Sequence, residues 1–433
     1  DTRSGELDSV VKVTDNTVFR ARLSPDGRVL AIAGRRDRTR QVEVQLIDVA
    51  TASPAAEPIE VPLRSLQPAD IAWDPRSAAL AVSDGCGIRI APLDGRTPTV
   101  LTVGRSERER AAALAWHPVS GLACASSGGR LFRWRDPTAE EPDVWDFWDD
   151  IVAAMADHEF EARRARTLAE HQALRGALAW RPDGGVLAFA AEGHLAIVDP
   201  IRRRVVDLTS TSFFHSAMDL EWCCDGASLA CTSRPALDSL RADPLDADIA
   251  LWRPEADRSE DDDGVVRASG WSVAWHPTEN LLAAASRDPV VRVQRADPEP
   301  PHVYRAVGSI RRADWQPGGQ LLALLAPQFE GNLIGVVDAD DPDILLWTHQ
   351  GVGRAAWSPD GRALAHGPSA IHGGPIRMRD ARTGEQIAQL DVRGGYGTGD
   401  LDVFRWPTPG HLLAADDVHR EVVLVDVDTA HRE

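Results

Sequence analysis

Apolar and polar residues recur along the chain in a fixed order of short segments. An alternating segment ends at an aromatic residue, a Pro-Asp-Gly turn follows, and a run of small apolar residues such as 281–285 comes next. Alternation with a period of two is typical of a half-buried strand, and Pro-Asp-Gly supplies the backbone angles of a tight turn. A third segment often ends in aspartate, as in 196–199, and a fourth is shorter and more polar, as in 302–307. The pattern predicts units of four antiparallel strands.

The unit occurs nine times. If the residue two positions before the proline is taken as an anchor, the anchors are Leu23, Trp73, Trp116, Trp180, Trp222, Trp275, Trp315, Trp357 and Trp406. Neighbouring anchors lie 40 to 64 residues apart, and a period of roughly 40 to 50 residues is typical of β-propellers. Eight of the 14 tryptophans occupy this one position, which chance placement would hardly produce.

The repeated frame also resembles a known family. The frame is Trp-x-Pro-Asp-Gly-x-x-Leu-Ala, clearest at 357–365, and the third strand closes on aspartate. In these residues the chain resembles the WD40-like and TolB-like β-propeller superfamily, which includes bacterial WD40-repeat proteins. The resemblance covers nearly the whole chain and implies an all-β propeller.

We therefore expect one domain, residues 1–433, folded as a single closed β-propeller of about nine four-stranded blades. Eight blades with one degenerate unit is the alternative. Only seven residues follow Asp426, too few for an outer strand of the ninth unit, whereas a strand at 9–13 precedes the first. We expect the N-terminal strand to complete the last blade, because closure removes exposed strand edges.

The third unit contains a helical insertion at about 136–172. Acidic residues occupy the first turn of the expected helix, where the helix dipole favours them. Its apolar stripe consists of Trp148, Ile151 or Val152, and Met155. Such a stripe must be buried, either on the rim of the propeller or on another protein, and we favour the rim. Trp145 and Phe147 lie off the stripe and are expected to contact a partner.

Insertions in the units gather arginine and aromatic residues on one face. In a propeller, the loops from second to third strands and from fourth strands to the next unit share a face. The candidate partner-binding residues there are Arg35, Arg36, Arg38, Arg40, Arg108, Phe213, Phe214 and Tyr396. Arginine and aromatic residues are enriched at interface hot spots. The alternative is that the two phenylalanines pack into the rim and the arginines are solvated.

Composition and charge narrow the function further. The net charge of −19 argues against binding to nucleic acid or anionic membrane, since both require a basic face. The sequence has no apolar run long enough to span a membrane and no signal-peptide pattern at its start, so we expect a cytoplasmic protein. The five cysteines show no metal-binding spacing and are expected to be buried. Acidic stretches at 260–263 and 338–343 lack the order of a calcium loop and are expected to be solvated turns.

The sequence carries none of the common catalytic motifs. The sequence contains no nucleophile elbow, P-loop, dinucleotide fingerprint or His-Glu-x-x-His helix. His117 and His276 follow anchor tryptophans and are expected to belong to turns. We therefore expect no enzyme, no cofactor and no metal, but a scaffold or regulatory subunit that binds one or more proteins. The alternatives are an enzyme or small-ligand module at the channel mouth, and a periplasmic TolB-like protein.

Overall fold

The computed structural model describes most of the predicted strands. It covers residues 9–11, 16–36, 41–49, 51, 53–62, 70–83, 87–103, 109–137, 141–154, 176–191, 194–210, 218–233, 248–252, 265–269, 272–285, 290–295, 302–305, 310, 312–326, 332–341, 345–368, 375–390, 404–408, 411–416 and 421–426. The chain divides into two compact units. The first unit is Asp1–Val61 with Trp271–Glu433, and the second unit is Pro62–Gly270.

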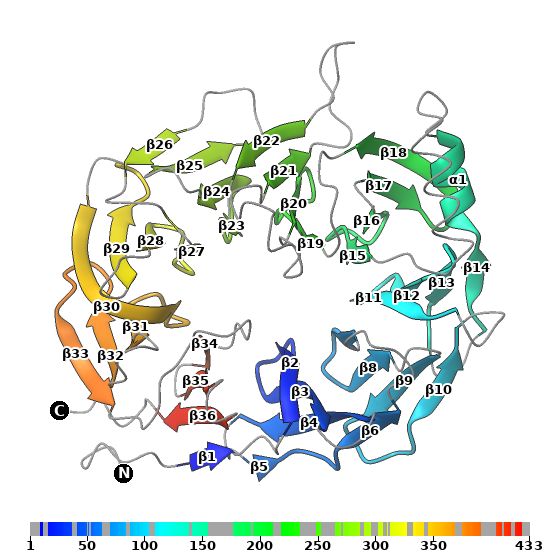
Figure 1. The fold of residues 1–433 in the computed structure, drawn as a ribbon, viewed down its shortest axis with the longest axis horizontal. Coiled ribbons are helices and arrows are strands. Elements are labelled where there is room, and N and C mark those ends of the chain that lie inside the picture. Colours follow the sequence, from blue (N-terminus) through cyan, green and yellow to red (C-terminus); the bar gives the residue numbers. More distant parts are fainter. Residues whose placement is uncertain are drawn as a thin grey trace, which may run out of the picture. The chain divides into compact units, whose positions relative to one another are not determined.

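The described part of the second unit forms four antiparallel sheets of four strands each (Figure 1). The first is β7 (Ile71–Trp73), β8 (Ala79–Ser83), β9 (Gly87–Pro92) and β10 (Thr99–Thr102). The next is β11 (Ala111–His117), β12 (Gly121–Ser126), β13 (Leu131–Trp134) and β14 (Asp143–Trp145). The third is β15 (Gly176–Trp180), β16 (Leu187–Ala191), β17 (His194–Asp199) and β18 (Arg204–Ser210). The fourth is β19 (Met218–Trp222), β20 (Leu229–Ser233), β21 (Asp248–Trp252) and β22 (Val265–Ser269).

The first unit contains the remaining described sheets. One is β2 (Asn16–Leu23), β3 (Val29–Arg36), β4 (Gln41–Asp48) and β5 (Ser53–Pro54), with β6 (Ile59–Pro62) also paired to β4. Another is β23 (Ser272–Trp275), β24 (Leu281–Ala285), β25 (Val290–Arg295) and β26 (His302–Arg305). A seven-stranded sheet is β27 (Arg312–Trp315), β28 (Leu321–Ala326), β29 (Asn332–Asp338), β30 (Leu345–Trp357), β31 (Ala363–Pro368), β32 (Ile376–Asp380) and β33 (Gln386–Leu390). Its long strand β30 pairs with both β29 and β31 and so belongs to two consecutive units of the repeat.

The last sheet joins the two ends of the chain. Strands β34 (Phe404–Thr408), β35 (His411–Asp416) and β36 (Glu421–Asp426) follow one another, and β1 (Ser9–Val11) pairs antiparallel with β36. The register places Ser9 opposite Leu424 and Val11 opposite Val422. The expectation that the N-terminal strand completes the sheet of the last unit is confirmed.

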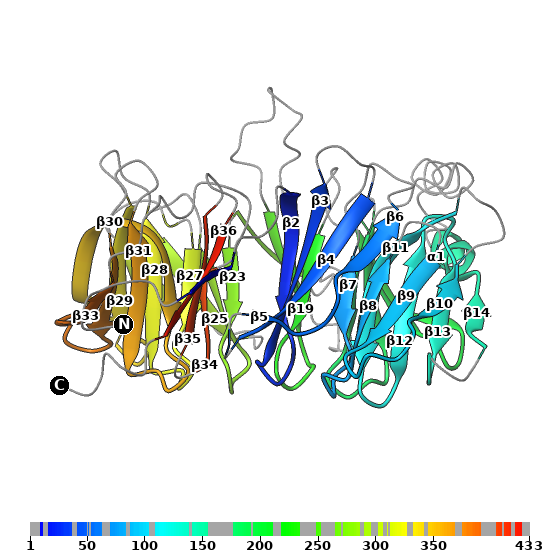
Figure 2. The same ribbon diagram turned by 90° about the horizontal axis from the view of Figure 1, so that it is seen from below.

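The turns between first and second strands follow the predicted chemistry. The glycines of these turns have positive φ, as at Gly184 (70°), Gly319 (73°) and Gly361 (71°). A residue with a Cβ rarely adopts this region, so glycine fixes where the chain reverses. Figure 2 shows β11, β12 and β13 side by side, with their connecting turns at two opposite ends.

The apolar core lies between successive sheets. In the second unit, Ala188 and Ile197 of one sheet form a cluster with Trp222 and Trp252 of the next. The second strand of each sheet is rich in small residues, because a neighbouring sheet packs close against it. In the first unit, Ala283 and Val293 cluster in the same way with Trp315. Each sheet is therefore stabilised by its neighbour, since a single four-stranded sheet exposes both faces.

The insertion forms one short described helix. Helix α1 spans Phe147–Ala154 and contacts β18 (Figure 1). Among the described residues, no helix has the length and apolar character needed to cross a membrane.

Candidate functional site

Four of the anchor tryptophans bind their own repeat to the repeat before it. The indole N–H of Trp222 donates to the carbonyl of Ala179, 3.1 Å away, the residue just before the preceding anchor. The same bond recurs from Trp180 to Ala115 (3.3 Å), from Trp315 to Ala274 (3.0 Å) and from Trp357 to Asp314 (3.0 Å). A buried indole requires a hydrogen-bond acceptor, so this one position both fills the core and sets the distance to the next sheet.

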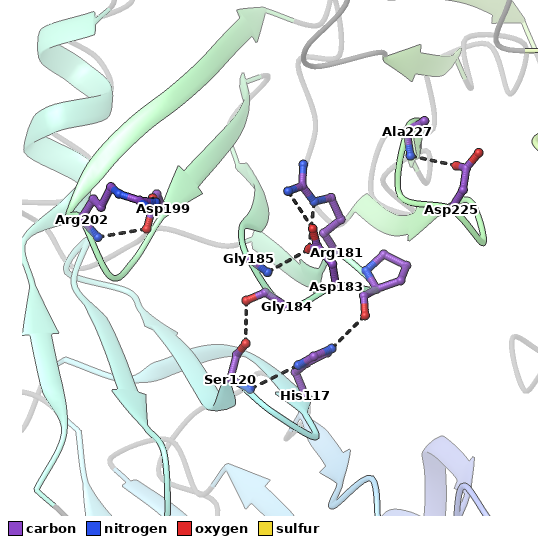
Figure 3. A network of polar contacts seen from close by, with 11 residues as sticks. His117, Ser120, Arg181, Asp183, Gly184, Gly185, Asp199, Arg202, Asp225 and Ala227 are labelled. Atoms are coloured by element: carbon purple, nitrogen blue, oxygen red, sulfur yellow. Dashed lines mark hydrogen bonds and ion pairs between the residues drawn. The ribbon is translucent and has the colours of Figure 1, made fainter.

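The residue after the anchor also contacts the next turn. His117 Nδ1 accepts the Ser120 amide, so Nε2 carries the proton that it donates to the Pro182 carbonyl, 3.1 Å away. The Ser120 hydroxyl donates to the carbonyl of Gly184 (Figure 3). A Cβ at Gly184 would overlap both of these side chains. The expectation that His117 is part of a turn is confirmed.

Two further units repeat this turn-to-turn contact. His276 Nε2 lies 3.0 Å from the Gly319 carbonyl, and Gln316 Nε2 donates to the Gly361 carbonyl. His276 is thus also part of a turn, as expected. These contacts stabilise one end of the sheets, so the turns there are structural elements.

One cysteine replaces a serine in this turn. The Ser358 hydroxyl donates to Asp360 and accepts the amide of Ala363. At the matching position, the Cys223 thiol donates to Asp225 (2.8 Å) and accepts the amide of Ser228 (3.0 Å). Burial raises the pKa of the Cys223 thiol to about 11, and the hydrogen bond to Asp225 adds to that rise. The thiol therefore acts as a neutral hydrogen-bond donor.

The cysteines otherwise divide by burial. Cys124 and Cys231 are buried, as expected, and burial raises the pKa of Cys124. Cys224 is exposed because it occupies the proline position at the corner of its turn. The expectation that every cysteine is buried is therefore wrong for Cys224, and Cys86 lies outside the described residues.

The inserted segment contradicts part of the predicted binding surface. Trp148, Ile151 and Val152 are buried, so this part of the apolar stripe packs on its own chain, as favoured, and Met155 lies outside the described residues. Trp145 and Phe147, expected to face a partner, are 8% and 0% exposed. That expectation is wrong for both.

The physical reason is the position of the helix start. Trp145 ends strand β14 and donates its indole N–H to Asp150, 2.7 Å away. Phe147 packs edge-on against Phe189, with ring centroids 4.9 Å apart. The helix begins at Phe147 and so directs this ring into the same core as Trp148.

The arginine and aromatic candidates are only partly described. Arg35 and Arg36 end strand β3, with Arg35 in register with Thr17 and Val42. They lie at the end of the sheet opposite the Pro-Asp-Gly turn. Arg38, Arg40, Arg108, Phe213, Phe214 and Tyr396 lie outside the described residues.

A buried ion pair lies in the second unit. We call Glu109, Ser126 and Arg130 the carboxylate cluster. The Arg130 guanidinium binds both oxygens of Glu109, with Nε 2.9 Å from Oε1. Ser126 donates to the same Oε1 (2.6 Å), and Arg130 lies over the ring of Phe132, 5.1 Å from its centroid. Both charges are less than 10% exposed, and each is compensated.

A second cluster, in the first unit, contains no carboxylate. We call His349, His366 and Arg379 the histidine cluster. Arg379 Nε donates to His366 Nε2 (3.1 Å), and Nη2 lies 3.1 Å from His349 Nδ1. Burial lowers the pKa of His366 to about 3, helped by the charges of His349 and Arg379. Burial likewise lowers the pKa of His349, so the arginine is solvated by neutral rings.

Sequence reasoning missed both clusters, because their members lie far apart in the sequence and follow no motif. Among the described residues, no three His, Cys, Asp or Glu side chains form a metal-binding group. In the acidic stretch 338–343, Asp338 accepts the amide of Asp340 (3.0 Å) and so forms a turn of its own. The stretch 260–263 lies outside the described residues.

Comparisons with known proteins identify the fold. The model of the WD domain, G-beta repeat family, matches residues 262–293, which span β22 to β25. No curated protein matches the chain. Among solved structures, the chain is similar to Sqt1 of Chaetomium thermophilum bound to the N-terminus of the ribosomal protein L10. The identity is 14% and the TM-score 0.52, over 97% of this chain and 100% of that chain.

Two other solved structures share less of the geometry. The β-propeller domain of Myceliophteria thermophila Cps50 (Swd1) has 16% identity and a TM-score of 0.42, over 76% of this chain and 98% of that chain. A chain of the mitotic checkpoint complex has 15% identity and a TM-score of 0.44, over 74% and 89%. The repeat match and the fold shared with Sqt1 support a WD40-type propeller.

Proposed function

We propose that the chain is a non-catalytic interaction scaffold, a regulatory subunit that binds a protein partner in the cytoplasm. The observation that carries this proposal is the fold shared with Sqt1 over almost the whole chain. Sqt1 was solved with the N-terminus of another protein bound to it. Fold similarity alone is an analogy, and the WD repeat at 262–293 supports it independently.

The same proposal includes one closed ring of nine blades. Its support is the pairing of β1 with β36, which gives the last unit a fourth strand from the other end of the chain. The described anchor residues each fall in the first strand of a unit. In a closed ring of this kind, the first and last strands of the chain pair with each other, so neither is left as an unpaired sheet edge.

The partner surface proposed is the loop end that includes Arg35 and Arg36. The Pro-Asp-Gly ends of several units are bound to one another by His117, His276 and Gln316. Loops on a rigid framework bind partners at small entropic cost. The longer connections at the opposite end of each repeat carry arginines, and they can differ from repeat to repeat without disturbing the Pro-Asp-Gly turns.

Charge reversal of Arg35 and Arg36 tests this surface. The variant Arg35→Glu/Arg36→Glu and the control Arg362→Glu, whose exposed arginine lies on a Pro-Asp-Gly turn, are purified from the native host with the wild type. We expect one partner, identified by mass spectrometry and reciprocal capture, to be recovered about tenfold less with the double variant. Circular dichroism verifies folding. Equal recovery with all three proteins would show that this face is not the binding surface.

A further inference from the structure

Two exposed apolar residues lie at the same end of neighbouring sheets in the second unit. Val119 and Ile201 are 81% and 60% exposed, the highest values among the large hydrophobic residues described. Val119 lies in the turn between β11 and β12, and Ile201 in the turn between β17 and β18. Single exposed apolar residues are common on protein surfaces, so their surroundings decide whether they matter.

The turn that holds Val119 is bound to the turn between β15 and β16, which belongs to the same sheet as the turn that holds Ile201. His117 and Ser120, on either side of Val119, bond the carbonyls of Pro182 and Gly184. Figure 3 shows these contacts beside the Asp199–Arg202 pair. Leu187 of β16 is in register with Val198 of β17. The β15–β16 turn and the β17–β18 turn therefore lie at the same end of this sheet, on adjacent strands whose spacing is roughly 5 Å.

The turn that holds Ile201 carries three consecutive arginines. Arg202 and Arg204 have side chains 73% and 60% exposed, and Arg203 is exposed between them. The turn has one carboxylate, Asp199, which is 2% exposed. It accepts the amides of Ile201 (3.0 Å) and Arg202 (2.9 Å) and the guanidinium of Arg202 (2.7 Å). The turn therefore carries three guanidinium groups and a single, buried carboxylate, and its local charge is positive. The chain as a whole has a net charge of −19, so this is a basic patch on an acidic protein.

An equivalent turn in the first unit shows that the arginines are not required by the turn. Asp380 accepts the amides of Arg382 (3.0 Å) and Thr383 (2.8 Å), the same pattern that Asp199 makes. Gly384 then corresponds to Arg203, and Glu385 to Arg204. Both positions have positive φ, 71° at Gly384 and 51° at Arg203.

Arginine is therefore placed where the backbone favours glycine. A residue with a Cβ at positive φ is strained, and such strain often accompanies a functional site. The nearest exposed acid of the neighbouring turn, Asp183, is already bound by Arg181 at 2.8 Å, and that hydrogen bond lowers the pKa of Asp183. The three arginines thus face solvent next to the exposed Ile201, and the exposed Val119 lies at the same end of the neighbouring sheet.

We propose that Val119, Ile201 and the arginines 202–204 form a docking surface for an acidic segment of a partner protein that also carries apolar side chains. Charge complementarity selects the acidic segment, and Val119 and Ile201 contact its apolar residues. The inference rests on the proposed scaffold function and adds a second surface, in the second unit, whereas Arg35 and Arg36 belong to the first.

A designed variant can remove the charge and keep the turn. Arg203→Gly/Arg204→Glu copies the Gly384-Glu385 sequence, and glycine relieves the strain at 203. The probe is a fluorescein-labelled peptide of glutamates flanking two leucines, read by anisotropy at about 50 mM NaCl, where surface charges are weakly screened. We expect the double variant to bind at least tenfold more weakly, Val119→Ser about threefold more weakly, and Arg362→Gln like the wild type. A peptide with glutamine in place of glutamate should also bind at least tenfold more weakly.

Several outcomes would overturn the proposal. They are no binding of the acidic peptide to the wild type, equal weakening by Arg362→Gln, and equally tight binding of single-stranded DNA, which would indicate a general polyanion site. A wild-type dimer in sedimentation that the double variant abolishes would identify a second copy as the occupant. The peptide assay does not involve Arg35 or Arg36, so it can fail while the host-partner experiment succeeds, and the reverse.

Discussion

The carboxylate cluster of the second unit and the histidine cluster of the first each contain an arginine, buried in the first case and partly buried in the second, but they compensate its charge differently. Arg130, in the turn between β12 and β13, is paired with the carboxylate of Glu109, which also accepts the hydroxyl of Ser126. Arg379 is solvated by two neutral rings, and one of them, His349, comes from the strand of the preceding unit. Removal of one partner of a buried ion pair destabilises the protein. A buried neutral histidine destabilises the protein when the pH falls and the ring takes up a proton.

Removal of the carboxylate should have the largest effect. Glu109→Ala leaves Arg130 buried without its counter-charge, so we expect the free energy of unfolding to fall by about 3–5 kcal/mol. Urea denaturation followed by tryptophan fluorescence measures it. Arg362→Ala, which removes an exposed arginine, is the control and should change stability by less than about 0.5 kcal/mol. A small effect of Glu109→Ala would show that water reaches Arg130.

Acid should act on the histidine cluster. The folded pKa of His366 is about 3 and lies below its ordinary value of 6.5, so the unfolded state binds more protons between these pH values. The contribution of the neutral His366 ring to the free energy of unfolding is complete above pH 6.5. It falls as the pH is lowered, and the loss reaches about 2 kcal/mol at pH 5. Urea midpoints at pH 7, 6 and 5 test this. His366→Gln keeps an acceptor for Arg379 and should flatten the dependence; an unchanged slope would exclude His366 as its source.

The serine of the carboxylate cluster should have the smallest effect. Ser126→Ala removes the hydroxyl that donates to Glu109 and accepts the Arg130 amide, 3.0 Å away. We expect a loss of about 1 kcal/mol, because the ion pair itself remains. A double-mutant cycle with Glu109→Ala measures the coupling between the two residues. Additive losses would show that the hydroxyl and the carboxylate act independently.

The sequence predicted the units of the fold well. Trp222 and Trp315, as anchors, end strands at the expected positions, and Gly184 and Gly361 have the positive φ that the turns require. Both successes depend on local chemistry repeated many times. The pairing of the N-terminal strand with the last sheet was also predicted, because the ninth unit lacked a fourth strand and a spare strand preceded the first unit.

The candidate site was predicted less well. Trp145 and Phe147 were expected on the surface, but the helix starts at Phe147 and both rings are buried. A shift of one residue turns a helix by about 100°, so periodicity without a fixed start does not say which side chains face outward. The arginines at 202–204 were passed over because their exposure and the strain at Arg203 appear only in three dimensions.

By itself the sequence determined where the strands end, where the chain turns and which small residues line the second strands, because backbone angles and strand alternation are local properties. Tertiary structure alone decided how charge and polarity are compensated. Glu109 contacts Arg130 between two connections, and His366 contacts Arg379 between neighbouring strands. The Trp222 indole donates to an acceptor in the preceding sheet. Such contacts depend on the distance between packed elements, and a single sequence does not show which residues far apart in the chain come close together.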